Sequence, residues 1–327
     1  MKIDFIASNQ NFEVGSFRIW VKSLSDVLNK KGFDTKIVTN ITDTRHDACL
    51  IFSKGDIIFS DLLIKDSRFK GAININRNSH KEFDFIICGS IEEKKSLELN
   101  YKNVFIINLI ENIHKNFSLK QHISNKDLTI GYHGNSVHLK RLNHGFVEAF
   151  NEVIESGINL KFLCISNDII ECRKTLIEIG LKKDVIECRK WNINKITEDI
   201  RDIDIGIVPN ISFENNINFF DNSCGLYDSD YIFRLKNKSN PGRAFVFIQH
   251  GVPVITDLTP SYMPIYFDEL AGSIAICQKT WKEGIIRFIK HEERNKVAKF
   301  AYDRFISLYS FENDVDKLIE FIKETCK

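Results

Sequence analysis

The most informative absence in this sequence is a charge excess of either sign. Its 45 lysines and arginines are balanced by 44 aspartates and glutamates, which leaves a formal net charge of +1. Proteins that hold nucleic acid through bulk electrostatics carry a large positive excess, so this class is excluded. We therefore expect no nucleic-acid partner, and any cationic site must be local.

The sequence also lacks an apolar run of the roughly 18 residues that a membrane-spanning helix needs. The opening stretch MKIDFIASNQ carries Asp4 among its few apolar residues, which is typical of a first β-strand and not of a signal peptide. Internal repeats and low-complexity linkers are absent as well. These absences predict a cytoplasmic protein.

No two cysteines have the CxxC spacing of a zinc or redox motif. The eight cysteines are Cys49, Cys88, Cys164, Cys172, Cys188, Cys224, Cys277 and Cys326. Most lie inside apolar runs such as FIICGS and KFLCIS. Scattered cysteines of this kind predict reduced, buried thiols in a cytosolic protein and argue against a metal site.

The chain does contain enough apolar material for a sizeable core, since 43% of its 327 residues are hydrophobic. At about 100–200 residues per domain, this length predicts two domains. Short apolar runs alternate with longer amphipathic stretches, which is the pattern of βαβ units and mostly parallel sheets. The polar stretch 118–128 interrupts this pattern, and we interpret it as the linker between two similar halves.

Each half is expected to be doubly wound. In the first half we expect helices at 15–33 and 91–100 and strands at 2–7, 34–39, 48–53, 71–76, 83–90 and 103–110. In the second half we expect helices at 142–157, 168–181 and 194–203, a helical tail from 281, and strands at 128–134, 159–166, 184–191, 204–209 and 252–256. Ligands of such sheets bind beyond the carboxyl ends of the strands, so the loops that follow strands are the candidate sites.

A cationic turn in the second half is the strongest of these candidates. Lys236, Lys238, Asn240 and Arg243 lie in the sequence KNKSNPGR, directly before the apolar run AFVFIQHGVPVI. The Pro-Gly pair before Arg243 indicates a helix start, where free N–H groups and a partial positive charge attract anions. Arginine can grip two phosphate oxygens at once. We predict a diphosphate site formed mainly by Lys238 and Arg243, the alternative being a solvated cationic turn.

Several motifs follow one another in a familiar order. They are SNQNFEVGSFRIWVKSLSDVLNKKGF, DFIICGSIEEKKSL, LTIGYHGNSVHLKRL, and DIDIGIVP followed by KNKSNPGRAFVFIQHGVPVI. Together they resemble the GT-B glycosyltransferases, especially the GT4-like enzymes (glycosyl transferases group 1), over nearly the whole chain. One departure matters. Many GT4-like enzymes carry a pair of glutamates flanking the donor-site turn and helix, whereas the matching segment here has Asn, Gly, Arg and Gln.

The resemblance implies an α/β protein of the GT-B fold, with two Rossmann-like doubly wound domains facing a central cleft. Residues 1–120 would form the acceptor-side domain and residues 121–310 the donor domain, and the helix 311–327 would cross back to the first domain. The implied reaction moves a sugar from a nucleotide-sugar to a glycan or lipid-linked glycan, with retention, in bacterial-type surface polysaccharide or glycoconjugate synthesis. The donor would be the only small-molecule partner, with no cofactor and no obligatory metal. Lipid-linked acceptors would also bring the protein to the inner face of a membrane.

The resemblance implies two further loops at the cleft. In the second half, Gly134, Asn135 and Lys140 follow a strand, and small residues there let the backbone approach a ligand. The alternative is an ordinary strand-to-helix connection. In the first half, the loop that ends at Gly15 and Ser16 would face the donor or the acceptor, together with Arg18 one helical turn later.

That first-half loop contributes Gly15, Ser16 and Arg18, and its alternative role is a plain helix cap formed by Ser16. A long loop at 210–230 combines acidic and aromatic residues, which suit sugar hydroxyls and ring faces, or else form an ordinary solvated surface. The catalytic residue stays unassigned.

Two other functions fit the same fold. One is a nucleotide-sugar epimerase or hydrolase, which needs a carboxylate or histidine placed for proton removal. The other is a non-catalytic nucleotide-sugar-binding protein that has lost its glutamates. Under the glycosyltransferase hypothesis, Arg243→Ala is predicted to weaken nucleoside-diphosphate binding by about 1.5–3 kcal/mol, the range for charge-assisted hydrogen bonds, and to leave folding intact.

Overall fold

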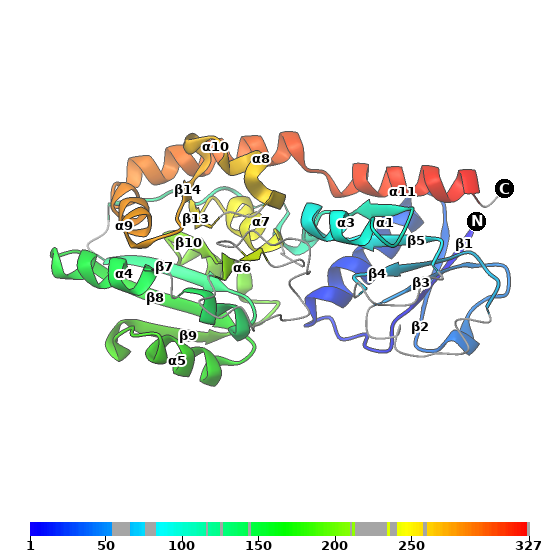
Figure 1. The fold of residues 1–327 in the computed structure, drawn as a ribbon, viewed down its shortest axis with the longest axis horizontal. Helices are drawn as coiled ribbons and strands as arrows, with labels where there is room; N and C mark the ends of the chain where they lie inside the picture. Colours follow the sequence, from blue (N-terminus) through cyan, green and yellow to red (C-terminus); the bar gives the residue numbers. More distant parts are fainter. Residues whose placement is uncertain are drawn as a thin grey trace. The chain divides into compact units, whose positions relative to one another are not determined.

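The computed structural model describes residues 1–53, 66–75, 83–115, 117–124, 127–142, 145–209, 211–212, 234–235, 241–257 and 260–325. These residues belong to two units, Met1–Asn112 with Ser310–Lys327, and Ile113–Tyr309. Each unit is built on one six-stranded parallel sheet that carries helices (Figure 1). The predicted α/β class, with two doubly wound Rossmann-like domains, is confirmed.

In the first unit the strands follow the order β2-β1-β3-β4-β5-β6, and all neighbours are parallel. The strands are β1 (Lys2–Ile6), β2 (Asp34–Val38), β3 (Cys49–Phe52), β4 (Lys70–Ile73), β5 (Phe85–Cys88) and β6 (Val104–Ile106). Every residue of β3, β4 and β5 is buried. This burial explains the continuous apolar runs of β3 and β5, because a central parallel strand is covered on both faces.

The helical segments of this unit are η1 (Phe17–Ser23), which has π-helical geometry, α1 (Leu24–Lys30), η2 (Ile41–Asp43), α3 (Ile91–Leu97) and α11 (Phe311–Thr325). The chain runs without a break from η1 into α1, so the predicted first helix exists with a π-helical first half. α11 packs on α1 and β6. Its Phe321 ring lies among the rings of Phe69, Phe85 and Phe105, at centroid distances of 6.1, 5.9 and 4.9 Å.

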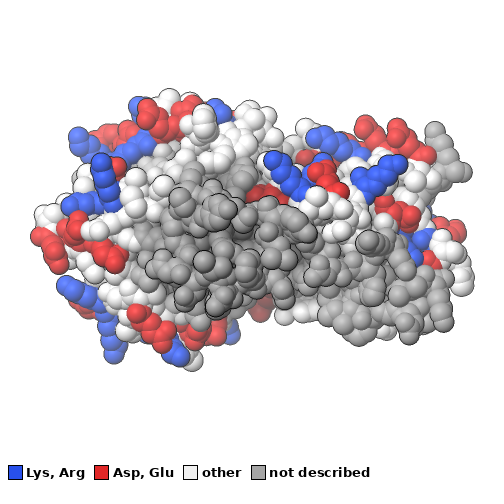
Figure 2. Space-filling view, in the orientation of Figure 1, with Lys and Arg blue, Asp and Glu red and all other residues white. Residues whose placement is uncertain are grey.

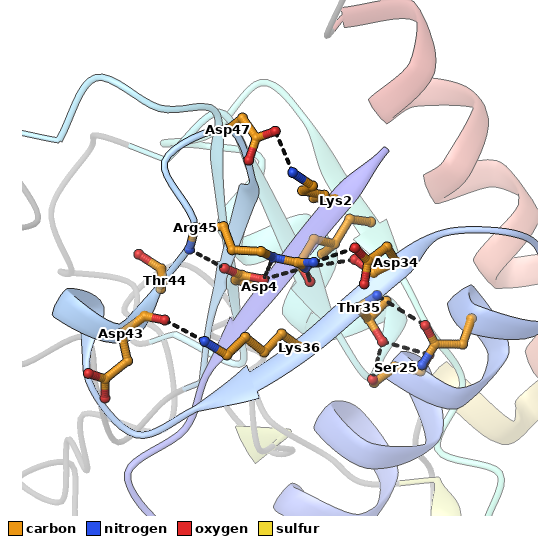
Figure 3. A network of polar contacts seen from close by, with 12 residues as sticks. Lys2, Asp4, Ser25, Asp34, Thr35, Lys36, Asp43, Thr44, Arg45 and Asp47 are labelled. Atoms are coloured by element: carbon orange, nitrogen blue, oxygen red, sulfur yellow. Dashed lines mark hydrogen bonds and ion pairs between the residues drawn. The ribbon is translucent and has the colours of Figure 1, made fainter.

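The one acidic residue in β1 is satisfied by an arginine from the β2–β3 connection. Asp4 is fully buried, and both Nε and Nη2 of Arg45 donate to its Oδ1, at 2.9 and 2.6 Å. The Arg45 backbone N–H donates to the other carboxylate oxygen, and the same guanidinium reaches Asp34 on β2 (Figure 3). A buried charge needs this kind of paired and hydrogen-bonded environment, so Asp4 ties the connection to the sheet.

In the second unit the strand order is β14-β13-β10-β7-β8-β9, again parallel throughout. The strands are β7 (Asp127–His133), β8 (Asn159–Ser166), β9 (Ile186–Lys190), β10 (Ile205–Val208), β13 (Val254–Thr256) and β14 (Ser273–Ile274). A separate antiparallel pair joins β11 (Ile211–Ser212) to β12 (Arg234–Leu235). β11, β12 and β14 were not predicted, because two-residue strands carry no periodicity.

The helices of the second unit are α4 (Phe146–Glu155), α5 (Ile169–Glu178), α6 (Ile196–Arg201), α7 (Gly242–Gln249), α8 (Met263–Tyr266), α9 (Gln278–Arg287) and α10 (His291–Leu308). Short turns of 3-10 helix occur at η4 (Asn112–His114), η5 (Ser136–Leu142), η6 (Lys183–Val185), η7 (Pro260–Tyr262) and η8 (Glu269–Ala271). α7 packs on β10, β13 and α10, and all eight of its residues are buried. α7 is therefore a core helix of this unit.

The stretch that we interpreted as a linker is anchored to the second unit. Lys120 donates to Asp204 at 2.9 Å and to the carbonyl of Ile203 at 2.8 Å. Burial raises the pKa of Asp204, but the neighbouring side chains, Lys120 among them, and the N–H of Thr129 lower it, and together they hold the pKa well below its ordinary value. The Asp204 carboxylate therefore stays charged, and it fixes this stretch beside the start of β10.

A buried histidine completes this anchor. Arg294 is fully buried, and its Nε lies 3.2 Å from Nδ1 of His122. Since arginine only donates, Nδ1 must accept, and the proton lies on Nε2, which donates to the carbonyl of Gly251 at 2.9 Å. Burial lowers the pKa of His122, in agreement with this neutral form. The 3.6 Å approach of Nδ1 to Asp204 is therefore not a hydrogen bond.

The charged surface agrees with the neutral composition. On the face drawn in Figure 2, the described lysines and arginines alternate with aspartates and glutamates. Charged side chains of the described residues also form ion pairs, such as Lys299–Asp303 and Lys161–Asp127. Among the coloured residues of this face, none builds a continuous basic area of the kind that bulk nucleic-acid binding requires.

Candidate functional site

The second sheet changes direction between β7 and β10. From β7 the chain adds β8 and then β9 on one side, whereas β10, β13 and β14 extend the sheet on the other side. In open α/β sheets, ligands bind beyond the carboxyl ends of the strands at such a switch point. The residues that follow β7 and β10 are therefore the first place to look for a site in this unit.

Arg243 lies at this switch point, although it comes from α7. Its Nη1 donates to the hydroxyl of Tyr132 on β7 at 3.2 Å, and its Nη2 approaches the carbonyl of Pro209, just after β10, at 3.5 Å. The guanidinium also lies over the Tyr132 ring, 5.7 Å from the centroid. Arg243, which we predicted as a diphosphate ligand, is 7% exposed. It is therefore buried beyond the carboxyl ends of β7 and β10.

Tyr132 holds the guanidinium in place. Its hydroxyl accepts from Arg243 and donates to the carbonyl of Asn135 at 2.8 Å. Burial raises the pKa of Tyr132 to about 12, so the phenol stays protonated at neutral pH and can donate one hydrogen bond while it accepts another. Because the ring itself is fully buried, the arginine rests on a rigid support.

His133, the last residue of β7, contacts the backbone of the same helical turn. Its Nε2 lies 3.0 Å from the carbonyl oxygen of Arg243, and a carbonyl only accepts, so Nε2 carries the proton. Burial lowers the pKa of His133 to about 4, which keeps the ring neutral at pH 7. The ring also meets Phe247 of α7 edge-on at 4.9 Å. β7 therefore fixes both the side chain and the backbone of Arg243.

Gly134 is required by this packing. Its φ of +133° is rarely adopted by residues with a side chain. A Cβ at this position would lie 2.9 Å from the Tyr132 hydroxyl and 3.1 Å from Cδ of Arg243. Two features that the sequence suggested separately, the glycine loop after the strand and the arginine of the turn, are thus in direct contact.

α7 begins where the sequence predicted, at Gly242, with Pro241 as its N-cap residue. Proline offers no side-chain acceptor, and the first turn contains no acidic residue. The positive end of the helix dipole is therefore not compensated from within the helix. Together with Arg243, this end forms a buried positive region at the switch point.

Other predicted residues of this half are only partly described. Lys236, Lys238 and Asn240 lie outside the described residues, as does most of the acidic and aromatic loop at 210–230. Lys140 lies in η5, but its side chain is not described, and Asn135 is exposed and offers its carbonyl to Tyr132. The diphosphate role of these residues stays a prediction.

In the first unit, Arg18 is engaged by a carboxylate that the sequence did not reveal. Its Nε and Nη2 donate to Oε2 of Glu111 at 2.9 and 2.6 Å, and its Nη1 donates to the carbonyl of Phe12 at 2.7 Å. Burial raises the pKa of Glu111, and the charge of Arg18 opposes this rise. Ser16 is exposed and makes no capping hydrogen bond, so the alternative of a plain Ser16 cap is wrong.

Gly15 is half-buried and lies beside Arg18, since a Cβ on it would stand 3.7 Å from Nη2. Glu111 and Tyr132 were missed because each is a single polar residue next to an apolar run. The sequence signal that could have found Tyr132 is its place at the end of a strand, directly before the glycine loop.

Within the described ranges, no three His, Cys, Asp or Glu side chains are grouped so that they could hold a metal ion. In the same ranges, no helix is both long and apolar enough to cross a bilayer.

Comparison with solved structures shows which fold this is. Sucrose-phosphate synthase from Thermosynechococcus elongatus superimposes with a TM-score of 0.66 at 12% identity, over 99% of this chain and 98% of that chain. HepE from Anabaena, solved with UDP and glucose, gives a TM-score of 0.65 at 10% identity, over 99% and 100%. TarM from S. aureus, solved in a complex that includes UDP, gives 0.59 at 12% identity, over 84% of this chain and 55% of that chain.

The sequence itself matches neither a protein-family model nor a curated protein. The predicted GT-B fold is confirmed, because two parallel six-stranded α/β units and these structural neighbours agree. At such low identity the likeness establishes the GT-B glycosyltransferase fold and leaves the activity to be argued from the site.

Proposed function

We propose that this chain is a glycosyltransferase that moves a sugar from a nucleotide-sugar to a glycan or lipid-linked glycan acceptor. The observation that carries the proposal is the convergence at the switch point of the second sheet. There the glycine loop after β7, the end of β10 and the first turn of α7 meet around Arg243. Each of these pieces was singled out from the sequence for a reason of its own.

The chemistry of sugar transfer explains why a fixed cation belongs there. When the bond from the anomeric carbon to the diphosphate breaks, negative charge grows on the leaving phosphate oxygens. A guanidinium and a helix N-terminus already in position stabilise that charge without reorganisation, which is the main source of rate in such sites. Under this proposal positive side chains assist departure and no obligatory metal is required.

Preorganisation is the specific contribution of Tyr132 and Gly134. A mobile arginine would lose rotamer entropy when it meets the diphosphate. Here that ordering is complete before the ligand arrives, because the phenol hydroxyl bonds the guanidinium and the glycine leaves room for it. Lys236, Lys238 and Asn240 would add further donors from the preceding turn.

The structural neighbours suggest which donor to try first. HepE was solved with UDP and glucose, and the TarM complex also contains UDP. We therefore infer a uridine nucleotide as the first candidate for this chain. Retention at the anomeric carbon and a role in surface polysaccharide synthesis rest on the family resemblance, and a lipid-linked acceptor would bring the chain to a membrane surface.

The test is a binding scan followed by turnover. Isothermal titration calorimetry compares UDP-, GDP-, dTDP- and CMP-sugars, and the best binder is then incubated with glycan and lipid-linked acceptors. Transfer of the sugar, with NMR assignment of the anomeric configuration in the product, supports the proposal. Release or isomerisation of the sugar without an acceptor would identify a hydrolase or epimerase.

The scan also addresses the missing glutamates. Tight binding without any chemistry would identify a non-catalytic nucleotide-sugar-binding protein, the alternative favoured by the lack of glutamate at 236–249. Failure to bind any nucleotide would overturn all three functions together.

A further inference from the structure

Three cysteines that are scattered in the sequence meet on one side of the second sheet. Cys164 is on β8, Cys188 is on β9, and Cys172 is on α5, which packs over both strands. Cys164 and Cys188 are direct partners in the parallel register of β8 and β9. Because paired residues point to the same face of a sheet, their side chains lie next to each other below α5.

The three thiols influence one another. The neighbouring thiols of Cys172 and Cys188 are the main reason why the pKa of Cys164 is raised. All three are free cysteines. They are not arranged to hold a metal ion, so the chemistry of the cluster is that of thiols.

One of the three thiols can be reached from solvent. Cys164 and Cys172 are fully buried, whereas Cys188 is only half-buried. Cys188 forms part of the wall of a surface pocket of about 440 Å³. The other residues of this wall are Ile169, Ile170, Arg173, Lys174, Ile177 and Lys183. A small solute that enters this pocket therefore reaches Cys188 in a wall that also carries three basic and three apolar side chains.

The surroundings of Cys188 favour its thiolate. The neighbouring Cys164 thiol is the largest effect that lowers the pKa of Cys188. The charge of Arg173, which lines the same pocket, adds to it against the opposing effect of burial. The thiolate is the reactive form of cysteine, and cationic, partly exposed positions are where reactive cysteines occur.

We propose that Cys188 is an oxidation site for peroxides and that Cys164 captures the oxidised sulfur as a disulfide. Neighbouring strands lie about 4.8 Å apart, and disulfides join Cα atoms about 4.4–6.8 Å apart, so the Cα atoms of register partners are within reach of the bond. Their Cβ atoms must approach to the roughly 3.5–4.5 Å that a disulfide needs, which takes a small local shift of the two strands. The site is independent of Arg243 and of the proposed glycosyl transfer.

The chemistry balances with the peroxide as the only oxidant. The Cys188 thiolate attacks the hydroxyl oxygen of the peroxide, the O–O bond breaks, and hydroxide or an alkoxide leaves with the electron pair and is protonated by water, which gives Cys188 sulfenic acid. The Cys164 sulfur then attacks the Cys188 sulfur. The S–S bond forms, the S–O bond breaks, and the proton of the Cys164 thiol leaves with the hydroxyl group as water.

Cys164 is the expected partner and Cys172 is not. Cys164 and Cys188 are register partners on neighbouring strands, whereas Cys172 lies on α5 and is paired with neither strand residue. Cys277 provides an internal contrast in the same chain. It is exposed, its sulfur lies 3.5 Å from the hydroxyl of Thr280, and no thiol is among its described contacts. It should stop at sulfenic acid.

The experiment treats the folded, reduced protein with hydrogen peroxide and maps its thiols by mass spectrometry. Trypsin alone leaves Cys164 and Cys172 in one peptide, so a protease that cleaves before aspartate is added. The combined digest separates residues 162–167, 168–173 and 184–189. We expect a disulfide between the first and third peptides, and a dimedone adduct, which marks sulfenic acid, on Cys277.

Variants isolate the two steps. Cys164→Ser should abolish the disulfide and leave a dimedone adduct on Cys188, whereas Cys172→Ser should leave the disulfide unchanged. Arg173→Leu should slow oxidation of Cys188 several-fold without affecting Cys277. Circular dichroism checks that each variant is folded, and the peptide map of the unmodified chain decides the question without them.

Three results would overturn the proposal. The first is an unmodified Cys188 under conditions that oxidise Cys277. The second is a disulfide that joins any other pair, such as the peptides 162–167 and 168–173. The third is a stable dimedone adduct on Cys188 of the unmodified chain, because it would show that Cys164 does not capture the sulfenic acid.

Discussion

Replacing Arg243 by methionine tests whether its buried guanidinium serves a ligand or only the fold. Methionine keeps most of the alkyl volume, whereas alanine would open a cavity at a position that is 7% exposed. The sequence-based prediction that an alanine variant folds intact therefore needs this revision. The Tyr132 hydroxyl still donates to the carbonyl of Asn135 in the methionine variant, so this buried hydroxyl keeps its acceptor. We expect a loss of about 1 kcal/mol in the free energy of unfolding.

The effect on ligand binding should be larger and selective for phosphate. A charge-assisted hydrogen bond contributes about 1.5–3 kcal/mol, which corresponds to an increase of about 10- to 150-fold in the Kd for UDP. Uridine carries no phosphate, so its affinity should not change. Calorimetric titration of both ligands into each protein gives the two numbers directly.

Two further variants frame this measurement. Tyr132→Phe keeps the ring under the guanidinium and removes only the hydroxyl, so UDP binding should weaken by about 2- to 10-fold, the effect of about 0.5–1.5 kcal/mol. Arg287→Met is the matched control. Arg287 belongs to the same unit and donates to the carbonyls of Glu269 and Gly272. These two residues precede β14, so Arg287 lies at the amino ends of the strands, whereas Arg243 lies at their carboxyl ends. It should bind UDP normally.

The reasoning fails if Arg243→Met binds UDP as tightly as the unmodified chain does. It also fails if uridine affinity falls as far as UDP affinity, because Arg243 would then shape the pocket without contacting phosphate. If UDP is not the best ligand in the nucleotide scan, the same pair of titrations uses the best nucleoside diphosphate and its nucleoside.

The remaining predictions concern the supports of the site. Gly134→Ala should destabilise the protein and weaken UDP binding, because the added Cβ would press on the Tyr132 hydroxyl and the Arg243 side chain. Gly157→Ala is its control. Gly157 has a φ of +93° and no atom within 4 Å of an added Cβ, so this variant has the backbone strain alone and should bind UDP normally. Asp204→Asn removes the carboxylate partner of the mostly buried Lys120 ammonium, so the free energy of unfolding measured in urea should fall by about 3 kcal/mol. Asp127→Asn breaks the exposed Lys161–Asp127 pair and should lower the same quantity by less than about 1 kcal/mol. Because the pKa of His133 is depressed to about 4, its neutral form stabilises the fold fully above the unfolded pKa of about 6.5 and loses this effect as pH falls toward 4. In a pH series of urea melts, the free energy of unfolding should fall less between about pH 6.5 and 4 for His133→Gln than for the unmodified chain. The same dependence on pH in both proteins would contradict this prediction.

Much of the architecture could be predicted from local patterns. The apolar runs of β3, β5, β8 and β10 are short and continuous because buried parallel strands are covered on both faces, and the structure places strands at all four. The start of α7 could be located because proline and glycine act on the backbone of their immediate neighbours. The GT-B fold then followed from the order of such motifs along the chain.

The predicted sites could be found only in part. Arg243 and Gly134 were singled out from the sequence as candidate site residues, but nothing local indicated that they lie side by side. Cysteines that looked scattered form a cluster of three, and Cys277, which was expected to be buried, is exposed at the start of α9. The roles of Lys236, Lys238 and Asn240 stay predictions outside the described residues.

The sequence by itself determined the elements, because helix and strand periodicity, turns and caps act over a few residues. Only the tertiary structure decided the partners. Arg243 and Tyr132 are 111 positions apart, and they meet because β10 takes its place beside β7 and carries α7 with it. Which strands become neighbours depends on the packing of the whole sheet, and for this reason a contact of such range leaves no trace in the residues that flank it.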